Sequence, residues 1–287
     1  MEATDLIRKV RKIEIKSRGL SNQIFAGEYH SAFKGRGMAF SEVREYQYGD
    51  DIRNIDWNVT ARFNHPYVKI FEEERELTVM LVVDISASRE FGTSIQTKRS
   101  LMVEIAAVLS FSAIQNNDKV GVILFSDRIE KFIPPKKGRK HILRVIRELI
   151  KFEPSSKETD ISVALKYLTN GIKKKSTAFL ISDFVSPSFE DSLRIAVKKH
   201  DMVALRVYDP RESELPPSGM MKVQDAESER RIWIDTDDPH TRSCYANHWE
   251  KLQKDTTEVL KRCGTDQATF RTDKDYVMPL MKLFKSR

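Results

Sequence analysis

The chain has 287 residues, a net charge of +7, and a composition of 40% hydrophobic and 32% charged residues. These proportions predict a packed core beneath a heavily charged surface. No apolar run approaches the ~18 residues of a membrane span, and the first residues lack the order of a signal peptide. Cys244 and Cys263 are too far apart for a Cys-x-x-Cys pair, and nothing suggests a disulfide framework. We therefore expect a soluble protein of the cytoplasm.

The first 76 residues lack the alternating buried strands and helices of the rest and are expected to form an N-terminal segment of their own. Residues 6–25 have the pattern of an amphipathic helix that packs on the body of the protein. Turn-rich stretches follow, and the alternation in residues 66–71 predicts a strand that enters the main sheet. The pair Gly35 and Gly37 lacks the flanking strand and helix of a dinucleotide-binding fingerprint.

Residues 77–83 form an almost purely apolar run, which predicts a strand buried on both faces of a parallel sheet. Asp84 ends the run, and Ser86 and Ser88 follow at alternate positions. In an open α/β sheet, ligands bind beyond the carboxyl ends of the strands. One carboxylate and two hydroxyls there could supply part of the oxygen shell of Mg2+. Alternatively, Asp84 only ends the strand and a serine caps the next helix.

Strands and helices alternate beyond this point, which predicts βαβ units. The expected strands cover residues 120–125, 129–133 (stopped by Pro134 and Pro135), 178–183, 202–208 and 269–271. The expected helices cover residues 98–115, 141–152, 189–200, 240–263 and 276–284, with one more beginning at Asp160. Residues 77–287 are therefore expected to form an α/β domain of Rossmann type. Its sheet is doubly wound and mainly parallel, with a β-hairpin inserted at about residues 210–239.

Five polar residues at the junctions of these elements resemble the metal-ion-dependent adhesion site of von Willebrand factor A domains. They are Asp84, Ser86, Ser88, Thr159 and Asp183. The resemblance implies that the hydroxyls bind Mg2+ or Mn2+ directly and that the carboxylates bind it directly or through water. A coordination position would stay open for an acidic side chain of a protein partner.

A second resemblance covers nearly the whole chain and rests on a motif upstream of the first buried strand. Its residues are Gly35, Gly37, Phe40, Arg44, Glu45, Tyr46, Gly49, Asp50, Asp51, Arg53, Ile55, Asp56 and Trp57. They are similar to the signature of the bacterial domain-of-unknown-function family 58 (DUF58), whose role is unknown. That family carries a von Willebrand A-like domain and is often linked to MoxR-type AAA+ ATPases, which implies such an ATPase, and other von Willebrand A-domain proteins, as partners.

Three residues depart from the resembled site. Arg89 follows the second serine, Glu158 stands where glycine is usual before the threonine, and Phe184 replaces the glycine that commonly follows the last aspartate. A guanidinium near the carboxylates opposes cation binding unless an acid such as Glu90 pairs with it. The site is thus expected to be intact, weak, or occupied by Arg89 itself.

We expect a non-enzymatic, protein-binding adaptor that acts with a MoxR-type ATPase in the cytoplasm, or peripherally at the inner membrane through its partners. A P-loop and a nucleophile-elbow motif are both absent from the sequence, and metal-assisted hydrolysis stays open as an alternative. The basic segment 131–151 is a further alternative as a nucleic-acid site. It lacks interleaved aromatic residues and is more typical of a solvated helix face.

Overall fold

The computed structural model describes residues 38–73, 77–92, 96–224 and 231–287, together with positions 11, 13, 14 and 17. Its internal contacts divide the chain into two units, residues 34–76 and the remainder. The expected N-terminal segment was residues 1–76, whereas the smaller unit begins only at residue 34. The helix expected over residues 6–25 lies mostly outside the described residues.

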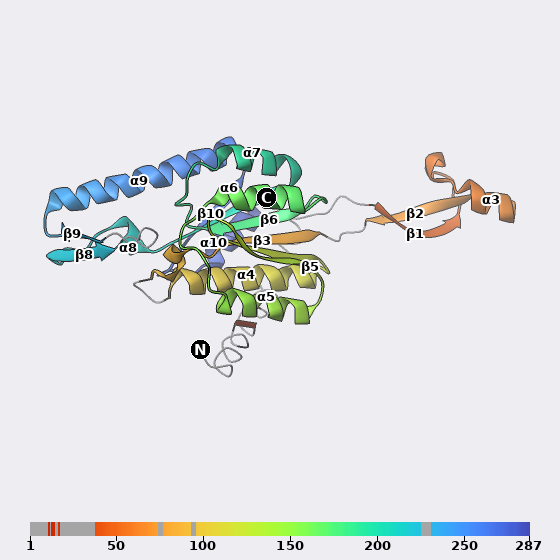
Figure 1. The fold of residues 1–287 in the computed structure, drawn as a ribbon. Helices are drawn as coiled ribbons and strands as arrows, with labels where there is room; N and C mark the ends of the chain where they lie inside the picture. The colour runs from red at the N-terminus through yellow and green to blue at the C-terminus, as the bar shows by residue number, and fades with distance from the viewer. Residues whose placement is uncertain are drawn as a thin grey trace. The chain divides into compact units, whose positions relative to one another are not determined.

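The larger unit is built around a six-stranded sheet with the strand order β10-β7-β6-β3-β4-β5 (Figure 1). The strands are β3 (Thr78–Asp84), β4 (Lys119–Phe125), β5 (Ile129–Lys136), β6 (Thr177–Ser182), β7 (Asp201–Tyr208) and β10 (Asp266–Arg271). Five of them run parallel, and only β5 is antiparallel to its neighbour. This arrangement confirms the α/β fold with a mainly parallel sheet.

Helices cover both faces of the sheet because successive side chains of a strand point to opposite sides. Val79, Leu81 and Val83 of β3 belong to a core formed with α4 (Lys98–Gln115), α5 (Arg139–Lys151) and α10 (Val277–Lys285). The intervening Met80 and Val82 belong to a second core with α6 (Ile161–Gly171), α7 (Glu190–Lys199) and the end of α9 (Pro239–Arg262). Figure 1 shows α4 and α5 below the sheet and α6 and α7 above it. The central strand is thereby shielded from solvent on both sides.

Strand β5 runs through both prolines to Lys136, so the expectation that Pro134 and Pro135 end it was wrong. It is the outermost strand of the sheet, where a missing N–H group is tolerated because no further strand needs it. The pairing with β4 is interrupted beside these prolines, between Val120 and Val122. A Cβ atom on the intervening Gly121 would lie 3.0 Å from the nitrogen of Pro135. Glycine therefore permits the close approach of the two strands.

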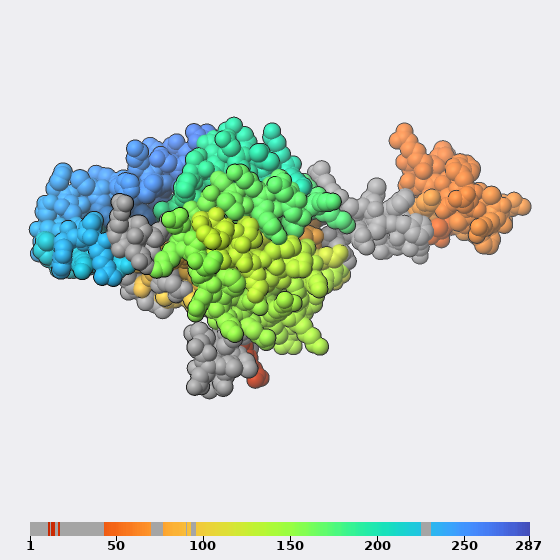
Figure 2. Space-filling view, viewed as in Figure 1, coloured from red at the N-terminus to blue at the C-terminus, as the bar shows by residue number. Residues whose placement is uncertain are grey.

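The inserted hairpin is present as β8 (Met220–Gln224) and β9 (Arg231–Asp235), which pair antiparallel. The short helix α8 (Pro210–Ser213) precedes it, and the 24-residue helix α9 follows. In Figure 2 the hairpin and the first turns of α9 lie together at one end of the larger unit, in cyan and blue. In the part of the chain that the structure describes, no helix has the length and hydrophobicity to cross a membrane.

Between residues 38 and 73, the smaller unit contains a two-stranded antiparallel sheet and two short helices. Its elements are β1 (Met38–Glu45), the 3-10 helix η2 (Ile52–Asn54), α3 (Trp57–Phe63) and β2 (Tyr67–Glu73). Strand β2 pairs with β1 rather than with the main sheet, so the expectation for residues 66–71 was right in type and wrong in location. Alternation shows that one face of a strand is covered, but it does not identify the sheet to which the strand belongs.

Candidate functional site

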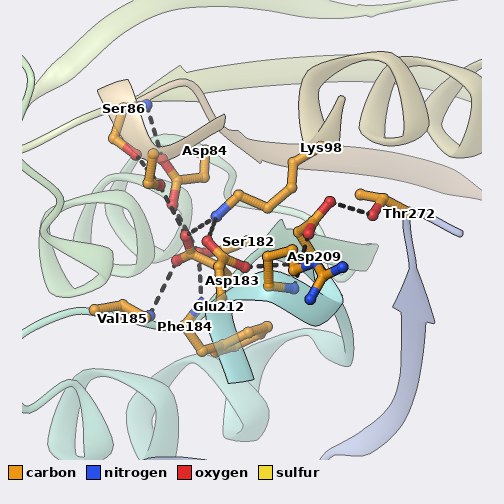
Figure 3. A network of polar contacts seen from close by, with 12 residues as sticks. Asp84, Ser86, Lys98, Ser182, Asp183, Phe184, Val185, Asp209, Glu212 and Thr272 are labelled. Carbon is orange, nitrogen blue, oxygen red and sulfur yellow. Dashed lines mark hydrogen bonds and ion pairs between the residues drawn. The ribbon is translucent and has the colours of Figure 1, made fainter. Parts of the chain in front are cut away.

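The candidate site lies at the carboxyl ends of β3 and β6, which are adjacent parallel strands (Figure 3). Asp84 is the last residue of β3, and Asp183 directly follows β6. Ser86 and Ser88 lie in the loop after β3, where the 3-10 helix η3 (Ala87–Glu90) turns the chain. Parallel neighbours end at the same edge, so the fold itself brings two acids and two hydroxyls together.

Hydrogen bonds connect these four residues into one network. The Ser86 N–H donates to one oxygen of Asp84 at 2.9 Å, and the Ser182 hydroxyl donates to the other at 2.7 Å. The hydroxyls of Ser86 and Ser88 lie 3.1 Å apart, and Ser88 donates to Asp183 at 2.7 Å. The two carboxylates are thus joined through serine side chains, and Ser182 is a member that the sequence motif did not include.

Thr159 lies in a segment that is hydrogen-bonded to the serine loop. The Ala87 N–H donates to the carbonyl of Lys157 at 3.1 Å, and the Asp160 N–H donates to the carbonyl of Ser126, just after β4. The Thr159 side chain is buried. Thr159 therefore lies two residues beyond the backbone contact with the serine loop and directly before the contact with the end of β4.

A buried lysine occupies the network, which the sequence motif did not indicate. The Lys98 side chain has 0% exposed surface, and its ammonium forms ion pairs with Asp183, at 2.9 Å, and with Glu212. Lys98 is the first residue of α4, directly after the N-cap Thr97. A cation at a helix N-terminus is opposed by the helix dipole. A lysine in the first turn of a helix that is buried over most of its length was therefore the available signal.

Helix α8 completes the network on the far side of Lys98 (Figure 3). The second oxygen of Glu212 accepts from the Asp209 N–H at 2.9 Å, and Asp209 caps α8 through the Arg211 N–H. The buried hydroxyl of Thr272 donates to Asp209 at 2.6 Å. The site is thereby connected to the ends of β7 and β10 and to the helix that leads into the hairpin.

Burial and the neighbouring charge of Asp183 raise the pKa of Asp84 to about 6. Burial alone would raise the pKa of Asp183 as well, but the ammonium of Lys98 and the hydrogen bonds from Lys98 and Ser88 lower it. Burial alone would lower the pKa of Lys98, yet the charges of Asp183 and Glu212 raise it. Asp183 and Lys98 are therefore a charged pair, and Asp84 is the carboxylate whose charge is least compensated.

Arg89 is not the basic residue that pairs with Asp183, although the sequence allowed it to occupy the cation site. Its side chain is buried, and its guanidinium donates to the carbonyl of Phe152 at 2.7 Å. The cation paired with Asp183 is Lys98 instead. Glu158 is exposed at the surface, and the side chain of Glu90 lies outside the described residues.

Phe184 adopts the left-handed backbone conformation, with φ at 63°. Glycine is favoured in this region, which explains why a glycine is common at this position in the resembled site. The Phe184 N–H donates to the Ser182 hydroxyl at 3.0 Å, and the buried ring packs 5.9 Å from that of Phe189. Packing and hydrogen bonding thus hold the strained turn that aims Asp183 at the serines.

The oxygen atoms of the site fit a hard divalent cation. Mg2+ and Mn2+ prefer carboxylate, hydroxyl and water oxygens, and the network presents two carboxylates and two hydroxyls on neighbouring loops. Its ionisable members are four carboxylates (Asp84, Asp183, Asp209 and Glu212) and the ammonium of Lys98, with the buried guanidinium of Arg206 close enough to interact with Asp183. Negative charge remains in excess. Within the described ranges, no three His, Cys, Asp or Glu side chains form a metal cluster, so any metal there depends on hydroxyl ligands.

The family signature lies in the smaller unit, where its acidic residues hold local structure. Arg44 pairs with Asp50 through two hydrogen bonds of 2.8 and 2.9 Å. Asp51 caps η2, and Asp56 caps α3. The remaining signature residues differ in placement: Gly49 has a positive φ of 108°, Arg53 and Trp57 are exposed, and Gly35 and Gly37 lie outside the described residues. These aspartates are caps and ion-pair partners rather than a carboxylate cluster.

The basic segment 131–151 spans the end of β5 and the helix α5. Lys131 pairs with Glu148 at 2.7 Å, and Arg139 pairs with Glu14. Ile142, Val145 and Ile146 of α5 face the core. Part of the positive charge is thus neutralised locally, and the basic residues of α5 share a helix with a core-facing stripe.

Comparison with solved structures supports the fold. An aerotolerance-related membrane protein of Bacteroides fragilis NCTC 9343 matches 73% of this chain and 97% of its own chain, with a TM-score of 0.50 and 15% sequence identity. The SpRpn10 VWA domain matches 74% of this chain and 95% of its own with a TM-score of 0.40 and 7% identity. At such low identity the first of these similarities concerns the fold alone.

Sequence comparison identifies the family. The Mycobacterium tuberculosis (strain ATCC 25618 / H37Rv) protein named "Uncharacterized protein Rv1480" is 32% identical over 287 residues, which cover 98% of this chain and 90% of that protein. A Mycobacterium avium protein, "Uncharacterized protein MAV169", is 28% identical over 160 residues, 54% of this chain and 93% of its own. The family model "Protein of unknown function DUF58" matches residues 42–255. Because that match covers well over half of the sequence, the chain belongs to the DUF58 family.

Proposed function

We propose that this protein is a non-enzymatic adaptor that binds another protein through the site at the ends of β3 and β6. The observation that carries the proposal is the convergence of Asp84, Ser86, Ser88 and Asp183 on one sheet edge, linked by hydrogen bonds. Thr159 borders them from the neighbouring loop. Sheet edges of this kind are where open α/β folds bind ligands.

In this proposal the five residues hold Mg2+ or Mn2+. The hydroxyls of Ser86, Ser88 and Thr159 supply neutral oxygens, and Asp84 and Asp183 supply negative charge. When bound, the cation would offer a coordination position to a carboxylate of the partner. Asp84 supports this assignment because its charge is buried and poorly compensated, and a buried charge requires a partner.

The chemistry of the network favours binding over catalysis. Ser88 donates to Asp183, whose lowered pKa makes it a weak base at neutral pH. The network's only described amine, Lys98, is ion-paired and fully buried. A nucleophile needs an adjacent base of suitable pKa and access to a substrate. The raised pKa of Asp84 suits a base, but the hydroxyl that donates to it, that of Ser182, is fully buried and faces no solvent.

The proposed partner is a MoxR-type AAA+ ATPase, as the family resemblance implies, and other von Willebrand A-domain proteins are further candidates. An ATPase of this kind would supply the energy of nucleotide hydrolysis, and this chain would present a client or a regulatory contact. Partners at the inner membrane would place the adaptor there peripherally.

The experiment is a binding measurement between the purified chain and the MoxR-type ATPase of the same organism, with Mg2+ or with EDTA. We expect binding to weaken in EDTA and in Ser86→Ala, which removes one candidate ligand without changing the net charge. The fold should lose only about 1 kcal/mol, because one hydroxyl hydrogen bond is lost. Ser110→Ala is the matched control, since Ser110 is a buried serine inside α4 that bonds the Ala106 carbonyl.

Equal binding in Mg2+ and EDTA, with Ser86→Ala as active as the unchanged protein, would contradict the cation-dependent contact. The smaller unit would then be the better candidate surface, because Tyr48, Ile52, Trp57 and Phe63 are exposed there. Loss of binding in Ser110→Ala to the same degree as in Ser86→Ala would show that the effect of Ser86 is not specific to the site.

A further inference from the structure

Lys98 and the candidate cation site share one carboxylate oxygen. Lys98 Nζ lies 2.9 Å from Oδ2 of Asp183, and the Ser88 hydroxyl donates to the same oxygen at 2.7 Å. Figure 3 shows the ammonium pointing into the cluster between Asp183 and Glu212. A cation held by Ser88 and Asp183 would therefore have this ammonium as a near neighbour.

The charges of the cluster act in two directions. Asp84, Asp183, Asp209 and Glu212 are four carboxylates. Against them stand two buried cations, the ammonium of Lys98 and the guanidinium of Arg206, which interacts electrostatically with Asp183. The remaining negative charge favours a cation, whereas the like charge of Lys98 opposes one. The attraction from the carboxylates and the repulsion from Lys98 act at the same buried place. The lysine therefore determines how strongly a cation is bound there.

The position of Lys98 is one that only the carboxylates can stabilise. Its side chain is fully buried, and it occupies the first turn of α4, where the helix dipole is positive. Burial and the dipole both disfavour an ammonium there. Asp183, after β6, and Glu212, after β7, are the acids that offset those costs. Lys98 is thus held in place by the site itself.

We propose that Lys98 is a built-in competitor of the divalent cation. It holds the affinity for Mg2+ low by pairing with Asp183, and in the cation-bound form it pairs with Glu212 alone. This inference rests on the cation site proposed above. It assigns to Lys98 the role of a positioning residue, which sets how strongly the site binds a cation without being one of its ligands.

The test is a calorimetric titration with MgCl2 and, separately, MnCl2. Lys98→Met removes the ammonium and nearly conserves side-chain volume. We expect its dissociation constant for Mg2+ to be lower than that of the unchanged protein by about tenfold or more, because a like charge is removed from the site. Glu212→Gln is the matched control, since it alters the same ion pair but keeps the ammonium. Its dissociation constant should be unchanged or higher.

Thermal unfolding with and without Mg2+ gives a second measurement. It can be made even if Lys98→Met is unstable in the absence of the cation. We expect Mg2+ to raise the melting temperature of Lys98→Met by more than that of the unchanged protein, because the cation replaces the missing positive charge. A variant that folds only when Mg2+ is added would support the proposal. If Mg2+ neither refolds the variant nor raises its melting temperature by more, the proposal is overturned.

The titrations separate this inference from the proposed function. Equal Mg2+ affinity in the unchanged protein and in Lys98→Met, with both lost in Asp84→Ala, would leave the cation site intact and overturn the role of Lys98. An equal gain of affinity in Lys98→Met and Glu212→Gln would also overturn it, since loosening of the ion pair would then be the cause. No binding in any variant would contradict the cation site itself.

Discussion

Asp84 and Asp183 of the larger unit are almost wholly buried, whereas Asp50, Asp51 and Asp56 of the smaller unit lie at or near the surface. The buried pair is linked through Ser86 and Ser88 of the loop after β3, and Asp183 also pairs with Lys98 at the start of α4. The surface aspartates satisfy neighbouring N–H groups and a nearby arginine. The same side chain therefore organises a long-range site in one region and local turns in the other.

The difference shows that a cluster of acids in the sequence does not by itself indicate a binding site. The surface acids are three within seven consecutive residues, and each is explained by a cap or an ion pair. The buried acids are far apart in sequence and meet only because β3 and β6 are neighbours. Long-range convergence is the stronger indicator, since buried charges persist only where partners are provided.

The largest effect on stability is expected from the buried ion pair. Lys98→Met should lower the free energy of unfolding without divalent cations by about 3–5 kcal/mol, because Asp183 and Glu212 are left buried and unpaired. Chemical denaturation followed by circular dichroism measures it. Lys254→Met, at an exposed position of α9, is the control and should change little. A loss below 1 kcal/mol would mean that water reaches the carboxylates.

A smaller, pH-dependent effect is expected from His200, which is buried between α7 and β7. Burial, together with the charge of Lys199, lowers its pKa to about 4. Below pH ~6.5 the unfolded chain binds a proton that the folded chain does not, so stability falls as the pH drops from about 6.5 to 4. The total loss should be about 2–3 kcal/mol.

His200→Asn should flatten this part of the stability curve, since the asparagine amide takes the position of Nδ1 beside the Ser176 hydroxyl and does not titrate. Denaturation midpoints measured at several pH values between 7 and 4 give the comparison. Parallel curves for the two proteins would show that His200 does not contribute to the acid sensitivity of the larger unit.

The smallest effect is expected from the exposed ion pair of the smaller unit. Arg44→Met removes the two hydrogen bonds to Asp50, but both side chains contact water and the lost bonds can be replaced by solvent. The denaturation midpoint should barely move. A shift as large as that of Lys98→Met would show that the turn around Gly49 holds the smaller unit together, and it would abolish the contrast between the two regions.

The sheet was predictable from sequence because its strands are continuous apolar runs of limited length. Residues 79–84 of β3 and 120–125 of β4 are fully buried, as such runs indicate. Asp84 and Asp183 were predictable as strand-end residues because each stands at or beside the point where an apolar run stops. The edge strand was not, because Pro134 and Pro135 end a strand in most contexts and are tolerated only at the outside of a sheet.

The polar partners of the site could not be predicted because they depend on tertiary contacts. Lys98 lies 85 residues from Asp183 and 114 residues from Glu212, and no local pattern relates such positions. Arg89 was the nearer basic residue in sequence, yet its guanidinium bonds the Phe152 carbonyl. Proximity in the chain was therefore a poor guide to which cation would meet the carboxylates.

The prolines of β5 also bear on how this protein behaves when it is concentrated. An outermost strand offers its free N–H and C=O groups to any extended segment that approaches, which is a common start of aggregation. Two consecutive residues of β5, Pro134 and Pro135, have no N–H group to offer. An incoming strand would find an interrupted ladder, so the sheet is protected against growth into a larger assembly along this side.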